Sequence, residues 1–338
     1  MSIAPIAPSP LPALAPSGAA QGAATPASQT AAATPALPAS PPDPAAALQS
    51  AMTALRQSAV VKQDGLANLM ANVLRAVSSG SLPPALQSAV QQLVDMHLPT
   101  DKPPSAADIK TALASSGLFT ESDLAKGGAP NDLKSGLGKL NQAAQAAAKS
   151  APDGAEVPHQ GPSVPPPMRG GVPVAQAATL PTLPKGADAA LTAKLLATGS
   201  EAALARQDLL QLASLPDPQN PSDKRWMVEV PLMTPQGPAV AQLVIARDGR
   251  STSTEAPEPV WRVGLAVNLE PLGPVRANLA LSGGHAWVTI AAERPESLDK
   301  LQQDAGWLSG ALQEAELESD LAFQSAAPAK PKRGGYGP

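Results

Sequence analysis

The side chains best suited to metal binding or acid–base catalysis are scattered along the sequence. The three histidines, His97, His159 and His285, fall in separate regions, and Asp95 is the acid nearest to any of them. Metal sites and acid–base pairs need several such side chains at short spacing. The pattern therefore predicts incidental histidines, no metal site and no cofactor.

Two other motifs carry part of a reactive pattern. Residues 135–140, Ser-Gly-Leu-Gly-Lys-Leu, lack the spacing and the preceding strand of a phosphate-binding loop. Glu293, Arg294 and Glu296 form an acid pair that could do acid–base chemistry. We favour a structural interpretation, because carboxylates at a helix start stabilise its free amides. No catalytic residue is predicted, and we expect the protein not to be an enzyme.

The composition limits how much of the chain can fold. Among 338 residues there are 40 prolines and 26 glycines, aromatic residues make up 2%, and cysteine is absent. Such a chain has no disulfides or thiolate chemistry, and it buries little apolar area outside a small core. The net charge of −4, without a basic stripe, argues against a nucleic-acid partner. No run of 18 apolar residues occurs, so no stable membrane insertion is expected.

The elements before residue 216 alternate between proline-rich and helical stretches. Residues 1–44 contain eleven prolines and a single charge, and are predicted to be a disordered export or tether region. Apolar residues spaced by three and four predict a helical region over 45–140 and a helix over 186–215. Between them, residues 141–185 are predicted to be a disordered linker.

From Arg225 onward the apolar spacing changes to two, which predicts strands. Pro295 then begins one amphipathic helix, a short edge strand follows at 317–323, and residues 326–338 form a disordered tail. The predicted fold class is α+β: a small domain at 222–325 of mostly antiparallel strands packed with one helix. All four tryptophans lie here, and Trp307 falls off the apolar stripe, so it is expected to be exposed.

Residues 269–318 resemble the carboxy-terminal domain of the bacterial flagellar hook-length control protein family. The similarity lies in a Leu-Gly-x-Val turn, two alternating strands, an acid-Arg-Pro-Glu helix start and an amphipathic helix. A Ser-Gly-Leu-Phe-x-Glu block within residues 109–140 resembles a second family feature. Pro271 is placed differently from the family's prolines, and Glu316 stands where a helix-ending glycine is usual. These departures leave open whether the chain is the main regulator or a diverged paralogue.

The resemblance implies a secreted molecular ruler that controls hook length. Such a protein is cytoplasmic before export through the flagellar type III apparatus, and meets hook subunits and the hook cap on its way. Its carboxy-terminal domain contacts the cytoplasmic domain of the export gate and switches export from hook to filament substrates. We expect a monomer. The alternative is a non-enzymatic Pro/Ala-rich scaffold or envelope-associated protein that presents this domain to another partner.

The expected partner-binding residues lie in one turn and one helix. The turn supplies Pro271, Leu272, Gly273 and Val275, and a loop with prolines and glycine loses little entropy on binding. The helix region supplies Pro295 and Trp307. Fully extended, the roughly 220 residues before the domain would reach on the order of 700 Å, which is ample for a measuring tether.

Overall fold

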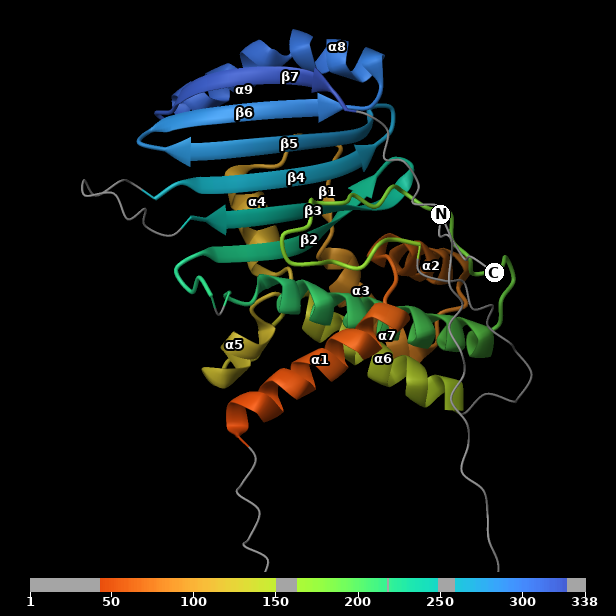
Figure 1. Ribbon diagram of the computed structural model, residues 1–338. Coiled ribbons are helices and arrows are strands. Elements are labelled where there is room, and N and C mark those ends of the chain that lie inside the picture. Colours follow the sequence, from red (N-terminus) through yellow and green to blue (C-terminus); the bar gives the residue numbers. More distant parts are fainter. Residues whose placement is uncertain (1–42, 150–162, 218, 249–258, 327–338) are drawn as a thin grey trace, which may run out of the picture. The chain divides into compact units, whose positions relative to one another are not determined.

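The computed structural model of the chain describes residues 43–149, 163–217, 219–248 and 259–326. It combines helices with one seven-stranded sheet, which confirms the α+β fold class (Figure 1). The helices are α1 Pro44–Lys62, α2 Leu66–Ser79, α3 Gln87–Asp95, α4 Ala106–Ala114, α5 Thr120–Ala125, α6 Leu133–Lys149, α7 Ala189–Ser214, α8 Pro295–Gln303 and α9 Ala305–Glu314, with a 3₁₀ turn at Pro84–Leu86.

The sheet follows the order of the sequence. Its strands are β1 Leu98–Pro99, β2 Lys224–Thr234, β3 Gly237–Arg247, β4 Trp261–Leu269, β5 Gly273–Ser282, β6 His285–Ala292 and β7 Glu318–Ser325. Strands β2 to β6 are antiparallel, whereas β1 and β7 pair in parallel with β2 and β6 at the two ends. Short turns suffice for the antiparallel pairs, but the parallel β7 needs a crossover, which α8 and α9 provide.

The turn between β5 and β6 has the geometry that its glycines predict. Ser282 pairs with His285, so only Gly283 and Gly284 connect the strands. Both have positive φ, at 57° and 76°. Glycine adopts this region without steric cost, which is why a two-residue hairpin favours it.

The helices before β2 share one core with the sheet. Helices α2, α3, α6 and α7 bring together leucines that are almost fully buried, and Val240 of β3 belongs to the same cluster. Burying one such leucine stabilises the fold by about 1.5–3 kcal/mol. The members with less than 2% exposure include Leu66, Met70, Leu86, Leu93, Leu133, Leu137, Leu140 and Leu196. The described helices before β2 and the sheet therefore belong to one compact unit.

Different helices cover the two faces of β2 and β3. On one face, Met227 and Val244 pack with Leu210 of α7. On the other, Val230 belongs to a cluster that also contacts Leu113 of α4. Residues 227 and 230 point to opposite faces because side chains alternate along a strand. Figure 1 shows α7 running beside β2 and α4 behind the sheet.

A buried ion pair joins α7 to β2. The side chains of Arg206 and Glu229 are 1% and 0% exposed, and Nη2 of the arginine lies 2.7 Å from Oε1 of the carboxylate. Arg206 Nε also donates to both carboxylate oxygens, at 2.8 and 3.0 Å. Its Nη1 donates to Gln63 Oε1 at 2.7 Å, and Gln242 Nε2 donates to Glu229 Oε1 at 3.0 Å. A buried charge is tolerated only with such full pairing.

The described part of residues 141–185 differs from the expected linker. Helix α6 continues to Lys149. Farther on, Gln176 and Val240 exchange backbone hydrogen bonds of 3.0 and 2.9 Å. These bonds hold the segment around Gln176 on β3. Its prolines therefore belong to an extended backbone that lies against the sheet. The predictions of disorder for 1–42, 150–162 and 327–338 concern residues outside the described ranges.

The single helix expected after Pro295 is divided at Asp304. The Asp304 backbone, at φ −85° and ψ 2°, ends α8 and precedes α9. Aspartate and the nearby Gly306 are poor helix formers, which explains the break. After α9, Glu316 has a φ of 60°, a conformation that favours glycine. This accounts for the glycine that the family pattern places there.

Candidate functional site

The turn between β4 and β5 is the element that the Leu-Gly-x-Val motif builds. Leu269 pairs with Gly273, so Glu270, Pro271 and Leu272 form the loop between them. The Glu270–Pro271 peptide bond is cis, and Gly273 has a φ of 70°. We call residues 270–273 the β4–β5 turn.

Arg294 holds this turn against the start of α8. Its two terminal nitrogens donate to the two carboxylate oxygens of Glu270, at 2.8 and 2.7 Å. Nη1 also donates to the Pro271 carbonyl at 2.7 Å. The two-pronged geometry suits a planar guanidinium and a carboxylate. Hydrogen bonds from Arg294 lower the pKa of Glu270, and the same contact raises the pKa of Arg294.

Ser297 adds a second contact between α8 and the turn. Its side chain is buried, and Oγ donates to the Leu272 carbonyl at 2.7 Å. The Glu293 backbone N–H donates to the Pro274 carbonyl at 3.3 Å. Side chains at the start of α8 thus hold the carbonyls of Pro271 and Leu272, which gives the turn one defined orientation.

Gly273 is required by the close approach of Arg294 as well as by its backbone conformation. A Cβ atom at this position would lie 2.6 Å from Arg294 Nε and 2.9 Å from Cζ. Such distances are shorter than van der Waals contact, so any side chain here must displace the guanidinium. By contrast, Gly284 also has positive φ but has no atom within 4 Å of the same position.

The structure brings most of the predicted site residues into this one cluster. Pro271 and Pro295 are exposed, Leu272 is half-buried, and Gly273 and Val275 are buried. The last three therefore shape the turn, and the two prolines face solvent beside it. Trp307 lies on α9 with 71% of its surface exposed, outside these contacts.

Sequence reasoning missed three members of the cluster. Glu270 and Ser297 were not singled out, and Arg294 was considered only as part of a helix start. The available signal was the presence of the two motifs, Leu-Gly-x-Val and acid-Arg-Pro-Glu. The sequence shows each motif but not that they lie side by side in the fold. Their proximity depends on β5 and β6, whose register sets Val275 opposite Ala292.

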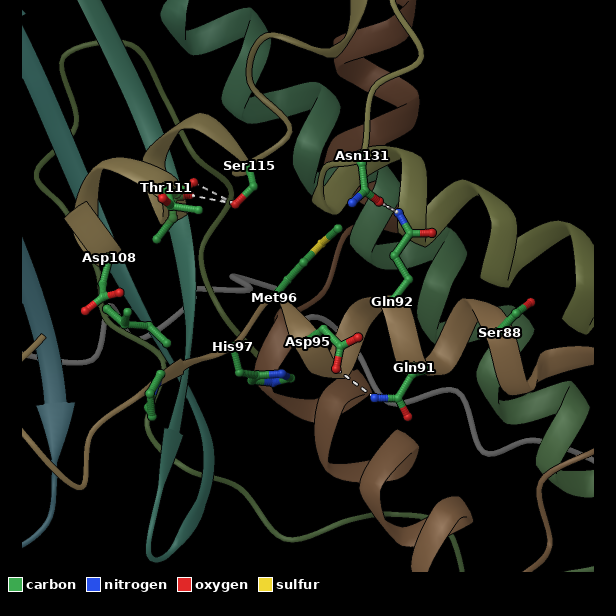
Figure 2. Close-up of a pocket in the computed structure, with 13 residues that line it drawn as sticks. Ser88, Gln91, Gln92, Asp95, Met96, His97, Asp108, Thr111, Ser115 and Asn131 are labelled. Atoms are coloured by element: carbon green, nitrogen blue, oxygen red, sulfur yellow. Dashed lines mark hydrogen bonds between the residues drawn. The ribbon is translucent and has the colours of Figure 1, made fainter. Parts of the chain in front are cut away.

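A cleft of about 740 Å³ lies elsewhere, between α3, β1 and α4 (Figure 2). Its polar side chains bond to one another: Gln91 to Asp95 at 2.7 Å, and Gln92 to Asn131 at 2.7 Å. Figure 2 shows these pairs lining the cleft near His97. One oxygen of the Asp95 carboxylate thus accepts from an amide, and among the described residues no hydrogen bond joins Asp95 to His97.

His97 is a packed side chain. Its Nδ1 lies 3.1 Å from the Val94 carbonyl, and Nε2 is buried without a partner among the described residues. Burial lowers the pKa of His97, so the ring is neutral at pH 7. Across the described ranges, no three histidine, aspartate or glutamate side chains are grouped as metal ligands. Within the same ranges, no helix has the length and apolar character to cross a membrane.

The carboxy-terminal part of the chain is similar to known proteins. The sequence profile of a family described as flagellar hook-length control protein FliK matches residues 249–331. A crystal structure described as the PscP SS domain is 33% identical over 20% of this chain and 70% of its own, with a TM-score of 0.18. Among curated proteins, none matches at a significant level.

The matched residues include β4 to β7, α8 and α9, which are the elements that build the β4–β5 turn and its contact with Arg294. The same residues carry the motifs on which the resemblance was based. Residues 249–331 of the chain therefore form a domain of the flagellar hook-length control protein family.

Proposed function

We propose that this protein controls hook length and that its carboxy-terminal domain switches type III export from hook to filament substrates. The observation that carries the proposal is the family match at 249–331, which coincides with the β4–β5 turn and the helix pair after β6. The proposed partner is the cytoplasmic domain of the export gate. Glu270, Pro271 and Pro295 offer an exposed surface for that contact.

The proposed ruler is the chain before β2. In the described part of this segment, α2, α3, α6 and α7 share a core with Val240 of β3, and Ala59 of α1 packs on α7. Measuring an extended length therefore requires that these helices unfold during export, when the chain passes hook subunits and the hook cap. Absence of cysteine and a core dominated by alanine and leucine are consistent with a chain that unfolds readily. The protein would be cytoplasmic first and secreted afterwards.

The test is the distribution of hook lengths in a strain that lacks this gene, measured by electron microscopy of purified hook–basal bodies. We expect overlong hooks without filaments. Hooks of unchanged length would contradict the proposal. They would favour the diverged paralogue or the scaffold role.

A pair of glycine variants tests the switch surface in the same strain. Gly273→Ala combines a positive φ with a clash against Arg294, whereas Gly284→Ala has the positive φ alone. Restoring the gene with Gly284→Ala should give normal hooks and filaments, and Gly273→Ala should leave hooks long and unfilamented. Equal behaviour of the two variants, with both proteins folded by circular dichroism, would remove the turn from the mechanism.

A further inference from the structure

Among the described residues, no strand pairs with the outer edge of β7. β7 is the last strand of the sheet and pairs in parallel with β6. The Glu318 N–H bonds to the Gly284 carbonyl at 3.0 Å, and the Ala326 N–H bonds to the Ala292 carbonyl at 2.8 Å. In a parallel ladder, alternate residues face the neighbouring strand. The odd-numbered residues of β7 therefore point their N–H and C=O groups outward: Ser319, Leu321, Phe323 and Ser325.

These outward groups have no backbone or side-chain partner among the described residues. The bonds that flank β7 all belong to its β6 side or to the end of α9, where the Leu317 N–H bonds to the Leu312 carbonyl at 3.0 Å. β7 itself, Glu-Ser-Asp-Leu-Ala-Phe-Gln-Ser, contains no proline, lysine or arginine. Proteins commonly use those residues to stop an exposed edge from pairing.

At the other end of the sheet, the short strand β1 pairs with only two residues of β2, and other contacts occupy further outward groups of β2. On β2, the Met227 N–H donates to Ser214 Oγ at 2.8 Å. The Met233 carbonyl accepts from the Thr100 N–H at 3.1 Å. Pro231 lies between them and has no N–H to offer. The outward groups of β2 are thus occupied, whereas those of β7 have no partner among the described residues.

The two faces of β7 specify what can pair with it. Leu321 and Phe323 are half-buried, while their neighbours Asp320, Ala322 and Gln324 are exposed. Leu321 and Phe323 therefore lie on the face that α8 and α9 cover, and Figure 1 shows these helices beside β6 and β7. The other face carries Glu318 and Asp320, whose side chains are 91% and 71% exposed. The His285 ring lies beside them, with Nδ1 3.6 Å from the Glu318 carboxylate and Nε2 3.0 Å from that of Asp320.

The two terminal segments of the chain are poor strands for this edge. Residues 1–44 hold eleven prolines, and residues 327–338 hold three prolines and three glycines. Proline lacks the N–H that a ladder needs, and glycine weakens strand pairing. The acidic face of β7 instead favours a strand with cationic side chains, and the occupant argued for is one from another protein.

We propose that β7 binds an extended strand of its partner, with apolar residues on one face and lysine or arginine on the other, as an eighth strand of the sheet. Backbone hydrogen bonds to the odd-numbered residues would give affinity. Apolar side chains would continue the layer of Leu321 and Phe323, and cationic ones would lie opposite Glu318 and Asp320. The proposal gives the β7 edge as a contact for the export-gate partner of the proposed function. It depends on the proposed function only for the identity of that partner.

The direct test uses the full chain and a synthetic peptide of alternating lysine and valine, KVKVKVKVK, with binding measured by fluorescence anisotropy. Ser319→Pro removes one outward N–H while leaving the ladder to β6 intact, and Ser319→Ala is its control. We expect Ser319→Pro to weaken binding at least about tenfold, a loss of about 1.4 kcal/mol, and Ser319→Ala to bind as the parent does.

Two N-methylated peptides give a second readout that is independent of protein folding. One is methylated at the lysines and the other at the valines, so each loses the backbone donors of one edge. In one strand direction only one edge of the peptide pairs with β7, and reversing the direction presents the other edge, so the two peptides should bind with clearly unequal affinities. No binding by the parent protein, or equal binding of both peptides, would overturn the proposal. So would a dimer that Ser319→Pro dissociates in sedimentation, because the edge would then serve a second copy.

The same variants separate this proposal from the proposed function. If the gene deletion gives overlong hooks and Gly273→Ala fails to restore them, hook control stands. If Ser319→Pro then restores normal hooks and filaments, the β7 edge is not the contact. Overlong hooks with Ser319→Pro and normal ones with Ser319→Ala would support it.

Discussion

Removing the arginine of the buried ion pair should destabilise the whole folded unit. In Arg206→Met the Glu229 carboxylate remains, 0% exposed, and keeps one hydrogen bond, from Gln242 Nε2. The substitution also takes away the donor to Gln63 Oε1. Breaking a fully buried pair by deleting one partner costs about 3–5 kcal/mol. Since a domain's total stability is about 5–15 kcal/mol, this is a large share.

The loss is measurable as a melting temperature. At about 2–4 °C per kcal/mol for a unit of this size, Tm should fall by ~6–20 °C. Lys62→Met is the matched control. Lys62 of α1 makes an ion pair of 2.8 Å with Glu201 of α7, and both side chains are more than half exposed, at 55% and 51%. Solvent screens that pair, and no measurable change in Tm is expected.

The double variant Arg206→Met/Glu229→Leu decides whether the reasoning is right. It leaves no charge in the interior, so it should recover much of the lost stability. If the Tm of Arg206→Met equals that of Lys62→Met within error, the buried ion pair does not stabilise the contact between α7 and β2. The same conclusion follows if the double variant is less stable than Arg206→Met.

Three further predictions concern other parts of the fold. Ser105 caps α4 by accepting from the Asp108 N–H, while the Asp108 carboxylate accepts from the Ser105 N–H; Ser105→Ala should therefore cost about 1 kcal/mol in urea unfolding, and an unchanged midpoint would contradict it. Burial holds the pKa of His97 below its usual value of 6.5, so the unfolded chain binds a proton more readily than the folded chain does. The free energy of unfolding is therefore highest above pH 6.5 and falls as the pH decreases towards the lowered pKa of the folded state. His97→Asn can still donate to the Val94 carbonyl without titrating, and its urea midpoint should fall less between pH 7.5 and pH 5 than that of the parent. Finally, a fragment of residues 216–338 should bind a hydrophobic dye more strongly than the full chain, since it loses α7 and exposes the face of Met227; equal dye binding would show that this face needs no cover.

Much of the carboxy-terminal fold was predictable because its signals are local. Alternation of apolar residues marks the strands, and Gly283 with Gly284 marks the hairpin. The chain's helices were visible as stripes spaced by three and four. Even Glu316 was flagged, and its positive φ explains why.

The contacts that organise the molecule were not predictable, because they join distant residues. Arg206 and Glu229 are 23 residues apart and each looks like a surface charge in sequence. Arg294 and Glu270 meet only because β5 and β6 lie between them in register. Residues 163–185 resemble a linker by composition, but the backbone bonds of Gln176 to β3 depend on where the strand lies.

The shared core of helices and sheet has a mechanical consequence. A chain drawn from its amino-terminal end gives up its elements in sequence order, and α1 contacts mainly α7, so it can detach first. Helices α2, α3, α6 and α7 interlock in one cluster and should yield together in a single step. That step also separates Arg206 from Glu229 and exposes β2 and β3. Tension on the amino-terminal segment should therefore act on these two strands before it acts on any strand of the family-matched region.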